Sequence, residues 1–349
     1  MFEIINHKLY KMKNLLFTSI ILMLISCSNT IKNNDSIVVF DDSILNIIDR
    51  TTEIEYIADS LSVAEGPLWD ENSSSLLFTQ VPKNKIYKWN EQEGYEVYIS
   101  PSGFTNYAPV IPNIGLSGAN GLTFDSDGNL IIAQHGDRRL SKIDNSPTTN
   151  PNFTTIVDNY EGSRFNSPND LVVSSSGDIF FTDPTYGFMN LSDWSFDESV
   201  KELDFSGVYK YSSGSGIELV SNELDFPNGL ALSNDERYLY VNSSNMTDAP
   251  IIQKIDLENE NKSELFFDGT ELAKESPGNF DGLKVHSSGN IFTTGPNGIL
   301  VLSEDGKLLA NIKFKDMLTN CAFDSDENYL YVTGFSFVAR IALNSVIHP

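Results

Sequence analysis

Six residues that carry a side-chain oxygen recur along the chain, and each stands at the start of a short apolar segment. We call them the head residues; they are Glu65, Asn120, Asn169, Asn228, Asp281 and Asn320. Carboxylate and amide oxygens are the ligands that hard divalent cations prefer, and Ca²⁺ takes about six to eight of them. Two buried carboxylates without a cation would repel each other, which raises the pKa of at least one. The head residues therefore predict a site for one divalent cation.

The two acids among the head residues decide the expected roles. Glu65 and Asp281 would together balance a divalent cation, and Asn228 is expected beside them as a third ligand. Asn169 is expected as a fourth ligand or as a holder of substrate and water, and Asn120 as a residue that faces the substrate. The alternative is that Asn or Asp before glycine only forms a turn. A turn explains a single Asn-Gly pair, but it does not explain an acid at the first and fifth heads.

The head residues can converge only if the segments behind them are equivalent parts of one closed fold. From about residue 53 to residue 342 the chain alternates short segments rich in Val, Ile, Leu, Phe and Tyr with Gly, Asn, Asp and Ser, a pattern typical of β-strands. The heads recur every ~40 to 60 residues, which suits one four-stranded sheet per repeat. We predict an all-β fold, a six-bladed β-propeller whose first strands line a central metal-binding channel. A β-sandwich is the alternative, but it leaves the recurring head residue unexplained.

Two further features belong to this predicted propeller. Residues 53–58 precede the first blade and are expected to supply the outer strand of the last blade, which would close the ring. Three longer insertions, at residues 101–118, 186–204 and 244–250, are candidate lids over the channel mouth. Their aromatic side chains could shape a substrate pocket or pack locally, and they are Phe104, Tyr107, Tyr186, Phe188 and Trp194.

The N-terminus has the features of a secretion signal. Three lysines precede an apolar run over residues 15–25 that is too short to span a bilayer. The run ends in Leu-Ile-Ser-Cys, which resembles a bacterial lipobox, so we expect residues 1–26 to be a lipoprotein signal peptide and Cys27 to be lipidated. An ordinary signal peptide with an incidental Cys27 is the alternative.

This processing predicts how the chain is divided and where it resides. Residues 27–52 are expected to be the lipidated cysteine and a polar tether, and residues 53–349 the propeller domain. The protein would then be lipid-anchored in a bacterial cell envelope, on the periplasmic or outer-membrane face. Met12 is a candidate start of translation in place of Met1, because Met-Lys-Asn-Leu-Leu is a compact beginning for a signal peptide.

The composition limits the partners. The chain has 349 residues and a net charge of −25, which disfavours nucleic acid or an anionic lipid surface as a partner. Contact with a membrane is therefore expected through the lipid anchor only. Cys27 and Cys321 are the two cysteines of the sequence, so no disulfide framework is available. We expect a monomer that acts on a small molecule.

Nine motifs spread over the mature chain carry a resemblance to a known family. They are Glu65-Gly-Pro-Leu-Trp, Asn120-Gly-Leu-Thr-Phe, Gln134-His-Gly-Asp-Arg-Arg, Asn166-Ser-Pro-Asn-Asp-Leu-Val-Val, Phe181-Thr-Asp-Pro-Thr-Tyr-Gly, Gly207-Val-Tyr-Lys, Pro227-Asn-Gly-Leu-Ala, Asp281-Gly-Leu-Lys-Val and Thr319-Asn-Cys-Ala-Phe. Together they resemble the SMP-30/gluconolactonase/LRE-like family. The resemblance implies a six-bladed propeller with one catalytic divalent metal in its channel, held by Glu65, Asn228 and Asp281, with Asn169 as a fourth ligand or a holder of substrate and water. It also implies hydrolysis of a lactone ring, with phosphotriester hydrolysis in relatives.

The expected reaction is the opening of a sugar lactone by water. A divalent cation, in the first place Ca²⁺ with Zn²⁺ or Mg²⁺ as alternatives, would polarise the ring carbonyl and stabilise the oxyanion. Asp281 is the expected general base, and His135 is a competing base that could equally be a structural histidine. In relatives an arginine near the third head grips the substrate. Here Ser167 stands two residues before that head, and Arg164 is the candidate for substrate binding.

Other functions remain open at this point. A non-catalytic propeller that binds a carbohydrate or a protein around a structural metal is the second hypothesis, and a phosphotriesterase-like hydrolase is a third. A serine triad is disfavoured because no Gly-x-Ser-x-Gly elbow stands between a strand and a helix. The fold alone cannot separate enzyme from binder; a deep pocket above an open metal position would favour the enzyme.

Overall fold

The chain was analysed as a computed structural model that describes residues 36–112, 115–144, 149–244, 250–276 and 278–344. The expected signal peptide, Cys27 and the alternative start at Met12 lie outside the described residues and stay predictions. No helix in these five ranges is long and apolar enough to cross a membrane.

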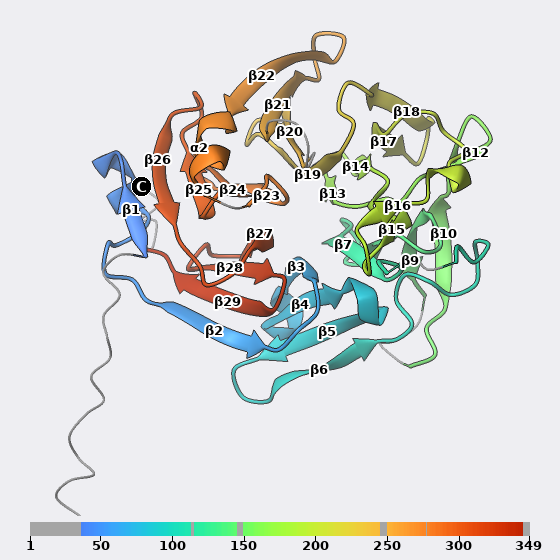
Figure 1. Cartoon of the computed structure of the whole chain (residues 1–349), viewed down its shortest axis with the longest axis horizontal. Helices are drawn as coiled ribbons and strands as arrows, with labels where there is room; N and C mark the ends of the chain where they lie inside the picture. The colour runs from blue at the N-terminus through green and yellow to red at the C-terminus, as the bar shows by residue number, and fades with distance from the viewer. Residues whose placement is uncertain (1–35, 113–114, 145–148, 245–249, 277, 345–349) are drawn as a thin grey trace, which may run out of the picture. The chain divides into compact units, whose positions relative to one another are not determined.

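Six antiparallel sheets stand around a common axis, which confirms the predicted six-bladed β-propeller (Figure 1). In blades 1 to 4 the strands follow one another in sequence from the axis outward, and in blades 5 and 6 the same order is completed by an outer strand from the N-terminal part of the chain. Blades 1 and 2 are built from β3 (Ala64–Asp70), β4 (Ser75–Gln80), β5 (Lys85–Asn90) and β6 (Gly94–Ile99), and from β7 (Ala119–Phe124), β8 (Leu130–Gln134), β9 (Arg139–Ile143) and β10 (Phe153–Val157).

The next two blades repeat this order. Blades 3 and 4 are built from β13 (Leu171–Val173), β14 (Ile179–Asp183), β17 (Gly207–Ser212) and β18 (Gly216–Ser221), and from β19 (Pro227–Leu232), β20 (Tyr238–Ser243), β21 (Ile251–Asp256) and β22 (Lys262–Asp268). Smaller elements lie between the blade strands: β11 (Asn159–Tyr160), β12 (Ser163–Arg164), β15 (Met189–Asn190), β16 (Ser195–Phe196), η2 (Glu71–Ser73), η3 (Val81–Lys83), η4 (Tyr186–Phe188), η5 (Glu198–Val200) and α2 (Thr270–Glu275).

The last two blades each receive an extra strand from the N-terminal part of the chain. Blade 5 contains β23 (Leu283–Val285), β24 (Ile291–Gly295), β25 (Gly298–Leu302) and β26 (Leu308–Ile312), and blade 6 contains β27 (Leu318–Phe323), β28 (Tyr329–Gly334) and β29 (Phe337–Ala342). β2 (Ile54–Asp59) pairs with β29, with Ile54 opposite Ile341, and the two run side by side in Figure 1. The closure predicted for residues 53–58 is therefore confirmed, and β1 (Ile37–Val39) adds a fifth strand beside β26.

Residues 37–48 pack against the propeller, although they were expected to belong to the tether over residues 27–52. β1 pairs with β26, and η1 (Asp42–Asn46) follows it. Ile44 and Ile48 are both 0% exposed and pack into the core between blades 5 and 6. The reason is that the isoleucines of this segment cover apolar surface that the outer strand of blade 5 would otherwise expose.

Apolar side chains fill the interface between each pair of neighbouring blades. Leu77 of blade 1 packs with Leu122 of blade 2, and Phe180 of blade 3 packs with Leu230 of blade 4. Comparable clusters lie at the other four interfaces. Each blade therefore buries one face on the blade before it and one face on the blade after it, which holds the six inner strands around the axis.

Candidate active site

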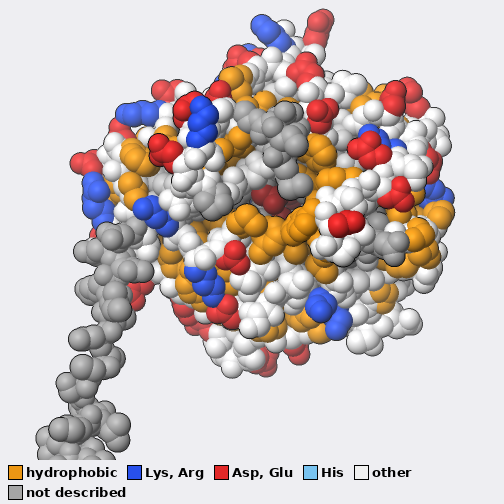
Figure 2. All heavy atoms as spheres, viewed as in Figure 1, with side chains coloured by type: hydrophobic (Ala, Val, Ile, Leu, Met, Phe, Trp, Pro, Cys, Tyr) orange, Lys and Arg blue, Asp and Glu red, His pale blue; other side chains and the backbone are white. Residues whose placement is uncertain are grey.

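A pocket lies at one end of the axis and brings five of the six head residues together. Its floor contains Glu65, Asn120, Asn169, Asn228 and Asp281, and its empty space measures about 900 Å³ and opens to solvent. Figure 2 shows acidic side chains at the base of this central hollow with hydrophobic side chains around it. The predicted convergence therefore occurs for these five heads.

Irregularities in the inner strands aim several heads at the axis. The register between β3 and β4 shifts after Glu65, the register between β7 and β8 shifts across Asn120, and that between β19 and β20 shifts across Asn228. A β-bulge of this kind bends the strand and turns a side chain away from the regular alternation. These heads lie inside strands, so the alternative that Asn-Gly only forms turns is wrong for Asn120 and Asn228.

The glycine after a head has a packing role. The Gly121 N–H donates to the Asn169 carbonyl at 2.7 Å, and the Gly229 N–H donates to the Asp281 carbonyl at 2.8 Å. A Cβ at Gly229 would lie 2.3 Å from that carbonyl oxygen. Only glycine permits this approach, so at these two positions the pair of head and glycine joins one blade to the next.

The two acidic heads occupy an environment that disfavours their charges. Burial raises the pKa of Glu65 to about 7, and the charge of Asp170 adds to the effect, against hydrogen bonds from the Gly66 N–H and the Asn320 amide. Burial and the charges of Glu65 and Asp170 raise the pKa of Asp281 well above its usual value, although the Asn228 side chain hydrogen-bonds to it. A cation on the floor would relieve this repulsion.

Two amide oxygens on the floor are buried without a hydrogen-bond partner among the described residues. They are Oδ1 of Asn120 and Oδ1 of Asn228. A buried amide oxygen is costly when nothing binds it. With the carboxylates of Glu65 and Asp281, the Asn228 oxygen forms a donor set that fits a hard divalent cation. The Asn120 oxygen is left to bind a substrate in the pocket. In the described part of the chain, no group of three or more His, Cys, Asp or Glu side chains is arranged so that it could hold a metal ion by itself, so the amide oxygens would be essential to such a site.

His135 fixes the orientation of the Asn120 amide. Its Nδ1 lies 3.2 Å from the Leu116 carbonyl oxygen, which only accepts, so Nδ1 carries the proton. Burial lowers the pKa of His135 to about 4, so the ring is neutral and Nε2 accepts from the Asn120 amide nitrogen at 3.1 Å. The opposite side of that amide, Oδ1, is thereby presented to the pocket. The Nε2 lone pair is engaged in this contact, which favours a positioning role over the predicted alternative of a base.

The structure does not bring Arg164 to the pocket. Arg164 lies in β12, where its backbone N–H donates to Glu202 at 2.9 Å and its guanidinium lies 3.8 Å from the same carboxylate. No arginine is among the described lining residues. The assignment of Arg164 to the substrate is therefore withdrawn. The reason is that β12 pairs with β11 in a separate hairpin, so nearness in sequence to Asn169 does not place it on the channel.

Two charged residues beside the floor, Asp170 and Lys284, were not predicted from the sequence. Asp170 is buried, and its Oδ2 lies 3.3 Å from the Asn320 amide nitrogen and 3.6 Å from Nζ of Lys284. Asn320 donates to both Glu65 and Asp170, so it links the two carboxylates. A signal was present in the sequence, because the third repeat has Asp170 at the position where four other repeats have glycine after the head.

The predicted insertions contribute in part to the pocket. Tyr186 and Trp194 line it, whereas Phe188 packs under the Arg138 guanidinium at 5.3 Å. Tyr107 lies under the Arg139 guanidinium at 3.9 Å.

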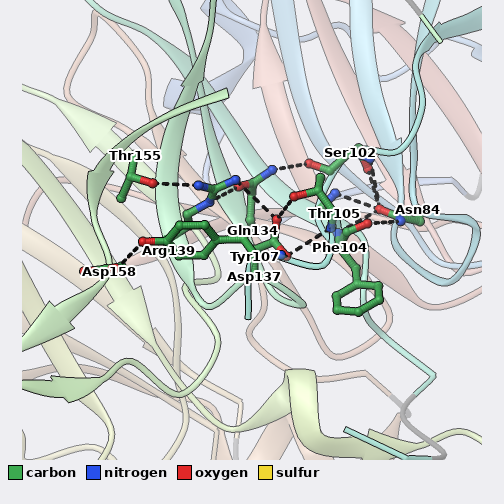
Figure 3. A network of polar contacts seen from close by, with 11 residues as sticks. Asn84, Ser102, Phe104, Thr105, Tyr107, Gln134, Asp137, Arg139, Thr155 and Asp158 are labelled. Carbon is green, nitrogen blue, oxygen red and sulfur yellow. Dashed lines mark hydrogen bonds and ion pairs between the residues drawn. The ribbon is translucent and has the colours of Figure 1, made fainter. Parts of the chain in front are cut away.

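The first insertion is held by a buried polar network (Figure 3). Asp137 accepts from the Thr105 and Tyr107 N–H groups at 3.0 and 3.2 Å. The Asn84 side chain accepts from Gly103 N–H at 2.7 Å. Leu116 lies farther along the same insertion. Next to it, the Gly115 N–H donates to the Met189 carbonyl at 2.9 Å, and the Gly136 N–H donates to the Ser117 carbonyl at 3.1 Å. These bonds hold the backbone whose carbonyl sets the tautomer of His135.

A family comparison agrees with this geometry. The model of the SMP-30/Gluconolactonase/LRE-like region matches residues 63–336. The chain belongs to this family. The match begins just before Glu65 and ends after Asn320, so it contains all six head residues of this SMP-30/gluconolactonase/LRE-like protein.

Relatives of this family member include characterised and structurally solved proteins. The chain is 36% identical over 309 residues to a gluconolactonase of Zymomonas mobilis, covering 84% of this chain and 82% of the relative. A Xanthomonas campestris gluconolactonase structure superposes with a TM-score of 0.75 at 24% identity, over 88% of this chain and 95% of that one. Regucalcin of Agrobacterium tumefaciens, described as a calcium-binding protein, superposes with a TM-score of 0.59 at 17% identity, over 85% and 97%.

The positioning role of His135 predicts a difference between two variants of this family member. His135→Phe removes both ring hydrogen bonds, and we expect kcat/KM for a lactone to fall by about ten- to a hundredfold, as for the loss of a buried hydrogen bond. His135→Gln keeps one acceptor and one donor, so it should restore most of the activity. If His135 were the general base instead, both variants would be equally inactive. Their residual rate would also lack the rise with pH that deprotonation of a histidine base produces.

Proposed function

We propose that the protein is a metal-dependent hydrolase that opens lactone rings. The 36% identity to a gluconolactonase over most of both chains supports a gluconolactonase-like hydrolase. The observation that carries the proposal is the floor of the pocket, where Glu65 and Asp281 lie among two amide oxygens that lack partners. A sugar lactone, glucono-δ-lactone, is the reference substrate because it gives the relatives their name.

The proposed metal ligands are Glu65, Asn169, Asn228 and Asp281, with Asn120 facing the substrate. Ca²⁺ is the first choice because every donor is an oxygen, and Zn²⁺ or Mg²⁺ are the alternatives. When bound, such a cation supplies Lewis-acid polarisation of the ring carbonyl. The calcium-binding relative noted above supports this choice, although that likeness alone establishes only the fold.

The residues of the chain supply the rest of the proposed reaction. Asp281 takes a proton from the attacking water while the water oxygen bonds to the carbonyl carbon. The bond from that carbon to the ring oxygen then breaks, and the proton moves from Asp281 to the leaving ring oxygen, so the product is a hydroxy acid. His135 holds Asn120 in place throughout. A lactone of this kind is an activated ester, so a carboxylate is a sufficient base.

Acid release measured by pH-stat tests the proposal. The purified protein should open glucono-δ-lactone faster than buffer alone, and faster than the same amount of Glu65→Gln protein. A neutral phosphotriester, assayed in parallel, should react at least about a hundredfold less efficiently. Faster turnover of the phosphotriester would favour the phosphotriesterase alternative. No turnover of any lactone, with a sugar or protein bound instead, would favour the non-catalytic propeller.

A further inference from the structure

The wall of the pocket differs in character from its floor. Above Glu65 and Asp281 the described wall is formed largely by apolar side chains, among them Leu116, Met189, Leu191, Trp194, Met317 and Phe335. In Figure 2 hydrophobic side chains border the hollow to the right and below. The pocket therefore has one polar end, where the reaction would occur, and one apolar end that opens to solvent.

The apolar side chains of the wall pack against one another and are not scattered singly. Leu116 and Met189 pack with Val81 into a cluster of their own at the mouth. The rings of Trp194 and Phe335 contact each other, with their centroids 6.5 Å apart. Trp194 is 48% exposed and Met317 is 42% exposed. Large apolar side chains gathered at the mouth of a pocket and left open to water are typical of a surface that a ligand covers.

The polar groups of the wall are engaged within the protein. The Tyr186 hydroxyl donates to the Ser244 carbonyl at 2.7 Å, and the Ser244 hydroxyl donates to the Phe280 carbonyl. The Thr319 hydroxyl donates to the Ala64 carbonyl at 2.6 Å. No lysine or arginine belongs to the described lining. The wall that the structure describes therefore offers little to a ring that bears several hydroxyl groups, each of which is costly to bury unpaired.

We propose that the preferred substrate is a lactone whose ring carries an apolar substituent, such as an alkyl chain, and that this substituent lies against the apolar wall. This inference rests on the proposed lactone hydrolysis. With the ring carbonyl at the polar floor, a chain on the carbon that bears the ring oxygen leaves the ring on the side away from the carbonyl and extends toward Trp194, Met317 and Phe335. Burial of that chain stabilises the complex through the hydrophobic effect. A fully hydroxylated sugar lactone is then the poorer fit.

A homologous series of δ-lactones tests the inference. δ-Valerolactone and δ-decalactone have the same six-membered lactone ring and differ by a pentyl chain. Because the reacting bond is the same, the ratio of their kcat/KM values measures the contribution of the pentyl chain's contact with the wall. We expect δ-decalactone to be favoured by at least about tenfold, since a hydrophobic pocket discriminates by about that factor or more per methylene. Glucono-δ-lactone should show a smaller rate enhancement over its own uncatalysed opening than δ-decalactone.

Two variants test whether the preference for δ-decalactone arises at the apolar wall. Trp194→Ser should bring the δ-decalactone to δ-valerolactone ratio down by about tenfold. Leu265→Ser is the matched control, because Leu265 is a similarly exposed apolar residue on β22, outside the pocket, and it should leave the ratio unchanged. A ratio near one in the wild-type protein, or a ratio that Trp194→Ser leaves intact, would overturn the inference while lactone hydrolysis stands. No turnover of any lactone would instead overturn the proposed function.

Discussion

Glu65→Gln and Asp281→Asn should each lower lactone turnover by about a thousandfold, because each removes one of the two charges that would hold the cation and stabilise the developing oxyanion. Asp281→Asn also removes the proposed base. Neither change alters the volume of the side chain appreciably, so the propeller should remain folded. Initial rates in the pH-stat assay, with Ca²⁺ present, measure the loss.

The same variants should be more stable than the wild type when metal is removed. The pKa of Glu65 is raised to about 7 from an ordinary 4.5, so the folded protein holds this proton more tightly than the unfolded chain. Stability without metal therefore falls as the pH rises from about 4.5 to 7 and stays low above that range. At pH 8, in the presence of a chelator, we expect Glu65→Gln and Asp281→Asn to melt at a higher temperature than the wild type. Added Ca²⁺ should raise the Tm of the wild type only.

Asp70→Asn is the matched control for these variants. Asp70 is a buried acid on β3, the strand that carries Glu65, but it caps η2 through the Asn72 N–H at 3.1 Å and lies outside the pocket. Its replacement should leave turnover and the Ca²⁺-dependent gain in Tm intact. Full activity in both pocket variants, or an equal loss in Asp70→Asn, would contradict the assigned site.

Ile48→Ala should lower the free energy of unfolding by about 2–5 kcal/mol, the range measured for truncating a fully buried isoleucine. Ile48 is 0% exposed and packs between blades 5 and 6. Ile44→Ala should behave alike, since Ile44 is 0% exposed in the same cluster. Urea denaturation followed by tryptophan fluorescence measures the change, and activity below the transition should be unaffected.

Phe40→Ala is the control from the same segment. Phe40 is 57% exposed, so its loss should change the free energy of unfolding by less than about 0.5 kcal/mol. If residues 36–48 were a tether, as the sequence suggested, Ile48→Ala would be as mild as Phe40→Ala. A mild effect of Ile48→Ala would therefore show that this segment does not belong to the core.

The fold was predictable because its signals are local and repeated. Each blade begins with a head residue and an apolar segment, and in four of the six a glycine follows the head. The strand at residues 53–58 follows from the need to close a ring. The segment around Ile44 and Ile48 belongs to no such repeat. Its position could not be predicted because it depends on apolar surface of blade 5 that exists only in the folded structure.

The site was predictable in its head residues but not in its details. Antiparallel pairing places Gln134 opposite Ala119. His135 and Asn120 each follow one residue of this pair, so the contact between their side chains can be anticipated within one blade. The contacts of Asp170 with Asn320 and Lys284 join different blades, so they depend on closure of the whole ring. The apolar wall likewise comes largely from insertions that no repeat describes, and Met317 and Phe335 add to it from beside β27 and β28.

Metal dependence of lactone opening is the most direct test of the proposed function. The protein is stripped with chelator, dialysed, and assayed by pH-stat for opening of glucono-δ-lactone and δ-decalactone while Ca²⁺, Zn²⁺ or Mg²⁺ is titrated in. We expect the stripped protein to be inactive, and its rate to rise with added cation until one ion is bound per chain. Undiminished turnover by protein shown to be metal-free would contradict the proposed mechanism.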